Sequence, residues 1–201
     1  MPVSSISLLP RRVPAFLLLA LASTASQAHP GHGAEGLLDG LAHPFGLDHL
    51  LAMVAVGVWS VVALPAKKMW WGPLTFMVAL AASALLGASG MAVPYLEQMV
   101  ALSVALLGAM LLLARQLPAA PGLALVAVAA SLHGLAHGAE APPAAIGAYA
   151  AGFLLTTAVL HFGGAFAFLG VQRLMAGRSQ TVTRLLGVAF GGTGLFLFSQ
   201  V

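Results

Sequence analysis

Most of the sequence divides into apolar blocks about as long as the thickness of a membrane. A helix needs about 20 mainly apolar residues to cross the hydrocarbon core of a bilayer. Hydrophobic residues make up 60% of the chain and charged residues only 6%, whereas roughly a quarter of a soluble domain is charged. A soluble protein is therefore excluded, and the lipid bilayer is the expected partner of the chain. Six such blocks are present, at residues 45–64, 71–89, 93–113, 122–137, 144–170 and 185–199.

Each block is predicted to form a transmembrane helix. Lipid offers no hydrogen bonds, so a spanning backbone must satisfy its own polar groups, as a helix does. The strict alternation of a transmembrane barrel strand is absent. The expected fold is an all-α polytopic membrane bundle, in which residues 29–201 form one domain of six transmembrane helices.

The first 28 residues have the layout of a signal peptide. Arg11 and Arg12 precede the apolar stretch 13–22, and small residues follow up to Ala28. Cleavage there would leave His29 as a periplasmic N-terminus, with the rest of the chain in the inner membrane of a bacterium. An uncleaved anchor helix is the alternative, which the short apolar core disfavours.

The charged residues indicate an orientation, because cytoplasmic loops carry an excess of Lys and Arg. With a periplasmic N-terminus, every basic residue after residue 28 falls inside. The pI near 10.0 then reflects membrane orientation, and the absence of a long basic run argues against nucleic acid as a partner. The inside residues are Lys67, Lys68, Arg115, Arg173, Arg178 and Arg184, and the acids at or near the outer side are Glu35, Asp39, Asp48, Glu97 and Glu140.

Seven histidines in so apolar a chain need an explanation. Ionisable groups at membrane depth are costly and usually face a cavity or a partner. The chain has no cysteine, which removes disulfides, thiolate zinc sites and iron–sulfur clusters. Any bound metal must therefore use nitrogen, oxygen or thioether ligands.

One group of candidate ligands opens the first predicted span. His43 precedes it, and Asp48 and His49 lie in its first turns, about 100° apart on an ideal helix. Gly46 allows a break or close packing there. Met53 lies one turn below His49, either as a weak thioether ligand or as packing mass.

A second group of candidate ligands ends the fourth predicted span. His133, His137 and Glu140 are spaced by one turn each, so they project from one helix face. Two imidazoles at this spacing can share a metal ion. Interhelical hydrogen bonding would explain one of these residues better than all three.

Three further histidines have less certain roles. His161, inside the fifth predicted span, is either a deeper ligand or relay, or a structural group that only makes hydrogen bonds. His29 and His32 would offer a capture site at the mature N-terminus, or form a disordered terminus without a role.

Both groups resemble the HupE/UreJ family of nickel and cobalt transporters. The run from His43 to Met53 is similar to the family pattern His-Pro-x-x-Gly-x-Asp-His-x-x-x-Met, with one residue fewer between Pro44 and the glycine. The run from His133 to Glu140 resembles the family element His-Gly-x-x-His-Gly-x-Glu. The family layout of a signal peptide and six spans, with histidines in the first, fourth and fifth, is similar over nearly the whole chain.

The resemblance implies a transporter rather than an enzyme. Its substrate would be Ni²⁺ or Co²⁺, taken up from the periplasm, with no permanently bound cofactor. A hydrogenase or urease metallocentre-assembly pathway would be the partner, and the oligomeric state stays open. Imidazole suits several divalent metals, so the choice of nickel rests on the resemblance alone. The chain lacks an ATP-binding loop, which favours a facilitator or secondary transporter.

Other functions remain open from the sequence. The run Gly87-Ala88-Ser89-Gly90 matches the short pattern of a rhomboid-like intramembrane serine protease. Facing histidines also suit axial ligation of a haem, although the neighbouring carboxylates fit a cation better. A metal sensor or storage protein would need the same ligands without transport.

Overall fold

The computed structural model describes residues 36–175 and 177–201, and these form helices with no strand among them. The all-α prediction is therefore confirmed for this part of the chain. The predicted signal peptide, His29, His32 and Glu35 lie outside the described residues.

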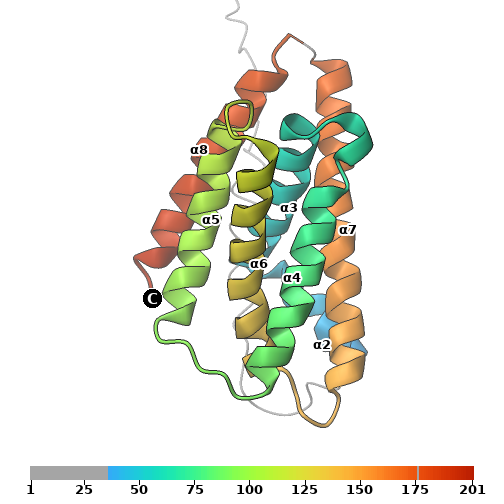
Figure 1. The fold of residues 1–201 in the computed structure, drawn as a ribbon, viewed down its shortest axis with the longest axis vertical. Coiled ribbons are helices and arrows are strands. Elements are labelled where there is room, and N and C mark those ends of the chain that lie inside the picture. The colour runs from blue at the N-terminus through green and yellow to red at the C-terminus, as the bar shows by residue number, and fades with distance from the viewer. Residues whose placement is uncertain (1–35, 176) are drawn as a thin grey trace, which may run out of the picture. The chain divides into compact units, whose positions relative to one another are not determined.

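Each of the six predicted blocks overlaps one long helix, and α6, α7 and α8 extend beyond the predicted bounds (Figure 1). Short helical segments precede two of the long helices. In chain order the elements are α2 (Leu37–Ala42), η2 (His43–Phe45), α3 (Leu47–Ala63), η3 (Ala66–Lys68), α4 (Trp71–Ala88), α5 (Leu96–Leu112), α6 (Ala119–Glu140), α7 (Ile146–Leu174) and α8 (Ser179–Phe198).

Four described helices are long and apolar enough to cross a membrane: α4 together with η3, α6, α7 and α8. The pair formed by residues 37–45 and α3 passes the same test as a unit but is bent by 76°. Counted as one broken span, this pair is the fifth. Helix α5 is apolar but has 17 residues, slightly short for a perpendicular crossing of about 30 Å. The chain is thus a multi-pass membrane protein.

The bend lies at the glycine where the sequence allows a break. Pro44 sits in the first turn of the 3₁₀ helix η2, and Gly46 has an extended ψ of 141° before α3 begins. The first predicted helix was expected to start at Phe45, and the structure starts it at Leu47. The bend separates His43 from the axis of α3, which lets its side chain approach α3 from the side.

Close helix pairs form the bundle: α4 lies along α6, α5 along α8, and both α2 and α3 along α7 (Figure 1). Glycines permit these approaches. A Cβ atom on Gly134 or Gly138 of α6 would collide with the carbonyls of Leu80 or Ala84 in α4. Gly108 of α5 meets the backbone of Gly191 in α8 in the same way. The absence of a side chain at these glycines is therefore what lets the helices pack closely.

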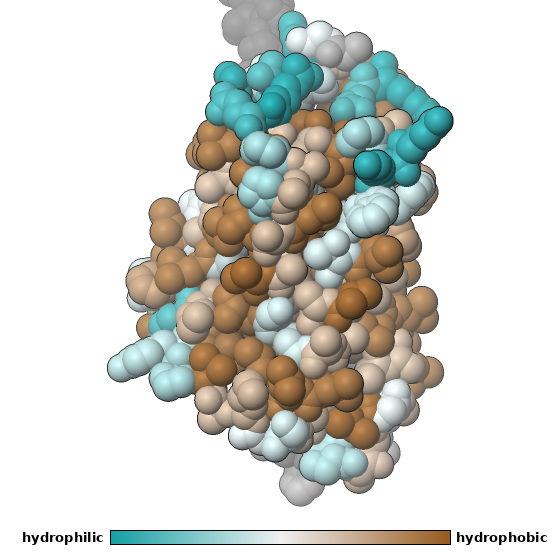
Figure 2. All heavy atoms as spheres, in the orientation of Figure 1, coloured by the Kyte–Doolittle hydropathy of each residue, from teal (hydrophilic) through white to brown (hydrophobic). Residues whose placement is uncertain are grey.

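The charged residues of the described part separate to the two ends of the bundle. The basic residues lie in η3, in the α5–α6 connection and around the α7–α8 connection, at the upper end of Figure 1. Figure 2 shows strongly hydrophilic residues gathered at that end and mostly apolar side chains along the helices below it. The acidic residues lie towards the opposite end, in α2 and near the ends of α3, α5 and α6 that face it.

Candidate metal centre

Three of the predicted ligands converge at the acidic end of the bundle. His43 of η2, His49 of α3 and His137 of α6 each place a ring nitrogen within 4.8 Å of the others. The ring centroids of His137 lie 4.2 Å from His49 and 4.6 Å from His43. Two nitrogens bound to one ion at about 2.0–2.1 Å lie no more than about 4.2 Å apart, so the three rings need only close in slightly to share an ion. The bend at Gly46 and the close packing of α6 together create this group.

Asp48 determines which nitrogen of His49 faces the other histidines. Its Oδ1 lies 2.6 Å from the Nδ1 of His49. A carboxylate only accepts hydrogen bonds, so Nδ1 carries the proton and Nε2 keeps its lone pair. Nε2 is buried and has no partner among the described residues. Metal-binding histidines are commonly oriented by a carboxylate in this way. The prediction that Asp48 is itself a ligand remains a prediction.

His137 lies deeper and has more unmet bonding capacity. Both of its ring nitrogens are buried without a hydrogen-bond partner in the described part of the chain. One face of its ring packs against Phe153 of α7, with centroids 4.1 Å apart. Buried polar atoms are normally satisfied, and leaving one unsatisfied costs about 1–3 kcal/mol. An ion at the three-histidine group would satisfy one of these two nitrogens.

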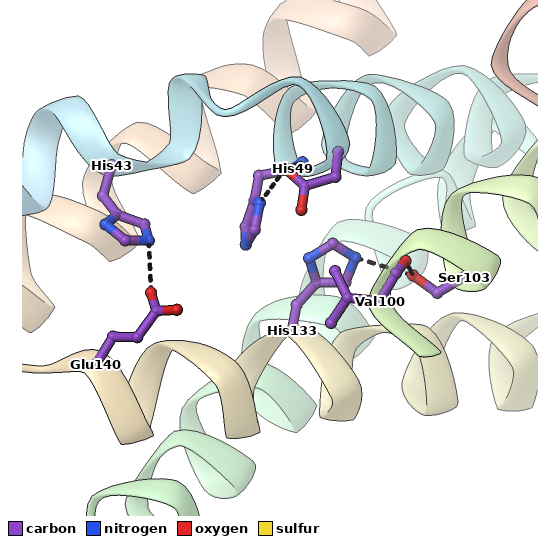
Figure 3. A network of polar contacts seen from close by, with 7 residues as sticks. His43, His49, Val100, Ser103, His133 and Glu140 are labelled. Carbon is purple, nitrogen blue, oxygen red and sulfur yellow. Dashed lines mark hydrogen bonds and ion pairs between the residues drawn. The ribbon is translucent and has the colours of Figure 1, made fainter. Parts of the chain in front are cut away.

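Glu140 closes the outer side of the group. Its Oε2 lies 3.4 Å from the Nε2 of His43, and its side chain is 59% exposed (Figure 3). Glu140 is the last residue of α6, so it reaches from the helix end across to η2. The predicted common face of His133, His137 and Glu140 is thus directed at η2 and the start of α3.

His133 lies next to His49 but outside the group of three. The two ring centroids are 4.7 Å apart, and the His133 side chain is fully buried. Its Nε2 is 2.9 Å from the hydroxyl of Ser103 in α5, and its Nδ1 has no partner among the described residues. Sequence reasoning missed Ser103, because a serine in an apolar helix commonly bonds its own backbone and gives no separate signal.

His161 has one bonded and one unpartnered ring nitrogen, so both interpretations from the sequence stay open. Its Nδ1 lies 2.7 Å from the carbonyl of Thr157, one turn earlier in α7, which is a structural hydrogen bond. Its Nε2 is buried and unpartnered within the described residues. The ring packs on Phe76 of α4, which also lies near His133, with centroids 4.7 Å and 6.0 Å away.

The remaining surroundings of the site are apolar. Met53 is fully buried among hydrophobic side chains of the core, in agreement with its packing role. A cavity of about 210 Å³ adjoins His137 between α4, α6 and α7, and apart from His137 and Tyr149 its lining is apolar. Such a lining gives a hydrated cation no polar contacts in exchange for water. The carboxylates of Asp48 and Glu140 lie beside the histidines but do not line this cavity.

The serine of the protease alternative is not arranged as a nucleophile. Ser89 caps the C-terminal end of α4 on the surface, and its hydroxyl donates a hydrogen bond to the carbonyl of Leu86 at 2.7 Å. A serine nucleophile needs a base within hydrogen-bond distance. No histidine of the described chain is hydrogen-bonded to Ser89.

Comparison with known proteins agrees with the two motifs. The family model described as "HupE / UreJ protein" matches residues 17–197. The protein named "Protein HupE" from Rhizobium leguminosarum bv. viciae is 41% identical over 184 residues, which cover 89% of this chain and 93% of that protein. No solved structure matches the chain. The extent of both matches shows that the chain belongs to the HupE/UreJ family.

Proposed function

We propose that this protein takes up divalent transition-metal ions, nickel and also cobalt, from the periplasm across the inner membrane. The observation that carries the proposal is the convergence of His43, His49 and His137, whose ring nitrogens lie within 4.8 Å of one another. Membership of the HupE/UreJ family supports nickel as the main substrate.

The ligand chemistry supports a transition metal rather than Mg²⁺ or Ca²⁺. Imidazole nitrogen suits Ni²⁺, Co²⁺, Cu²⁺ and Zn²⁺, whereas Mg²⁺ and Ca²⁺ prefer sites made of oxygen. Carboxylates next to the imidazoles, at Asp48 and Glu140, offset part of the ion's charge. This mixed set holds an ion without a thiolate, which suits reversible binding.

In the proposed path, the ion enters at the end of the bundle that carries Glu140. It loses part of its hydration shell to Glu140 and His43, and then binds His49 and His137. His133 and the deeper His161 offer further unpartnered nitrogens towards the interior. A membrane potential of 100 mV, negative inside, favours inward movement of a divalent ion by about 4–5 kcal/mol. A facilitator or secondary transporter therefore needs no ATP.

The proposed topology has six spans and a periplasmic mature N-terminus after cleavage of residues 1–28. The bent pair of residues 37–45 and α3 would be the first span, and α5 the third. The excess of basic residues at one end of the described bundle supports a cytoplasmic location for that end. The imported metal would then supply the assembly of a hydrogenase or urease metallocentre.

Uptake by purified protein in proteoliposomes tests the proposal. Radioactive nickel should accumulate in vesicles with an interior-negative potential, and unlabelled cobalt should compete more strongly than magnesium. His49→Ala should abolish accumulation, because it removes the nitrogen that Asp48 orients. Nickel uptake by this variant at the wild-type rate would overturn the proposed site, and the absence of uptake by the wild type would overturn the proposed function.

A further inference from the structure

The hydrogen bonds of Ser103 determine the tautomer of His133. The serine hydroxyl lies 2.7 Å from the carbonyl of Val100, one turn earlier in α5, and donates its only proton there. The same oxygen lies 2.9 Å from the Nε2 of His133. Because the proton of the hydroxyl is already used, Nε2 must be the donor in this contact. His133 is therefore protonated on Nε2 and carries its lone pair on Nδ1.

The lone pair on Nδ1 is directed into the site. Figure 3 shows this nitrogen on the side of the ring that faces His49, opposite the nitrogen that contacts Ser103. The ring centroids of His133 and His49 are 4.7 Å apart. Nδ1 of His133 and Nε2 of His49 are both buried and unpartnered among the described residues. A cation between or beside them would satisfy both lone pairs, which otherwise lack a donor among the described residues.

We propose that Ser103 is a positioning residue of the metal site, which holds His133 in the tautomer that offers Nδ1 to an ion bound at His49. The inference rests on the proposed function, and it adds helix α5 to the elements that build the site. The role parallels that of Asp48, which fixes His49 by accepting a hydrogen bond from its Nδ1. A neutral serine performs the task at His133, so it orients the ring without adding charge.

Removal of the Ser103 hydroxyl should change the tautomer of the His133 ring and leave the fold unchanged. In Ser103→Ala the Nε2–H form loses its acceptor, and the Nδ1–H form, which cannot bind the ion through Nδ1, becomes populated. Loss of such an orienting partner typically lowers metal affinity or activity by about 10- to 100-fold. We expect a loss of that size in both nickel affinity and nickel uptake.

Ser60 provides the matched control. It is a fully buried serine of α3, and its hydroxyl donates to the carbonyl of Val56 at 2.7 Å, with no hydrogen bond to a histidine of the described chain. Ser60→Ala therefore removes the same kind of buried hydroxyl and should leave nickel uptake unchanged. Ser103→Thr keeps a hydroxyl that can bond the preceding turn, and it should restore uptake to near the wild-type rate.

The deciding measurement is nitrogen NMR of histidine-labelled protein in lipid bilayers without metal, beside nickel binding and uptake. The signals of His133 are assigned by their loss in His133→Gln. The wild type and Ser60→Ala should show Nε2 protonated and Nδ1 free, and Ser103→Ala should show a mixture. Unchanged tautomer populations or wild-type uptake in Ser103→Ala would overturn this inference alone. A wild type that shows the expected tautomer but takes up no nickel would overturn the proposed function, and the metal role of Ser103 with it.

Discussion

The carboxylate of Asp48 lies 2.6 Å from the Nδ1 of His49 and leaves the Nε2 of that ring free in the site. The two residues are adjacent in the chain, and the helix that holds them begins at Leu47. The orientation of His49 is thus set within a single helical turn. The rings next to His49 come from other segments, His43 from η2 and His133 and His137 from α6.

The first prediction concerns this pair. In Asp48→Asn the side chain keeps its size but loses its charge, and its amide can donate to Nδ1, which moves the ring proton to Nε2. Nickel uptake should fall by about 10- to 100-fold, the usual cost of losing an orienting partner. The initial rate of nickel uptake into proteoliposomes measures this loss. Asp39→Asn changes an acid of α2 at the same end and should have no comparable effect, so an equal loss in both variants would point to surface charge instead.

A second prediction concerns the three-histidine group. His43→Ala and His137→Ala each remove one of three nitrogens that lie within 4.8 Å of one another. Each should lower the affinity for Co²⁺ at least as much as the loss of an orienting partner does, which is about 10- to 100-fold. The visible spectrum of bound Co²⁺ in detergent should also change, because it reports the number and type of ligands.

The control for this experiment is Phe45→Ala, two residues from His43. Phe45 is exposed. The Phe45→Ala protein should therefore bind Co²⁺ with the wild-type affinity and spectrum. If both histidine variants retained the wild-type spectrum, the ion would be bound elsewhere.

A third prediction concerns the packing of α6 against α4. A Cβ atom on Gly138 would collide with the carbonyl of Ala84, so Gly138→Ala should push the helices apart and move the adjacent His137. Overpacking of this kind costs about 1–3 kcal/mol, and thermal unfolding in detergent should show a lower midpoint together with weaker nickel uptake.

Gly192→Ala in α8 is the matched substitution. Nothing lies within 4 Å of a Cβ atom at this position, and alanine is favoured over glycine in a helix by about 0.5–1 kcal/mol. Its unfolding midpoint should be equal or slightly higher. A Gly138→Ala protein as stable as Gly192→Ala would mean that the helices can separate without cost.

A fourth prediction concerns orientation in the membrane. The chain has no cysteine, so single cysteines can be placed on an unreactive background. Ala92 and Gln116 are exposed positions in the connections at the two ends of α5. Ala92→Cys should react with a membrane-impermeant maleimide in intact spheroplasts, and Gln116→Cys should react only after permeabilisation. The reverse pattern would contradict the proposed direction of uptake.

The sequence by itself determined the class of fold, the positions of the long helices and the chemistry of the site. Block length, the charges that flank the blocks and the residue types within them are local properties, and lipid leaves a helix as the only solution for each block. The prediction of a break near Gly46 came from the same local source. The identity of most polar side chains at the site also follows from their rarity in an apolar chain.

The tertiary structure decided which of these side chains act together. His43 joins His49 and His137 because the chain bends by 76° before α3 and because glycines let α6 approach α4. His133 lies just outside that group, and Ser103 of α5 fixes its tautomer. The sequence of α5 did not mark Ser103 as a residue of the site. Contacts between distant segments depend on helix spacing and rotation, and neither quantity is encoded in the periodicity of any one segment.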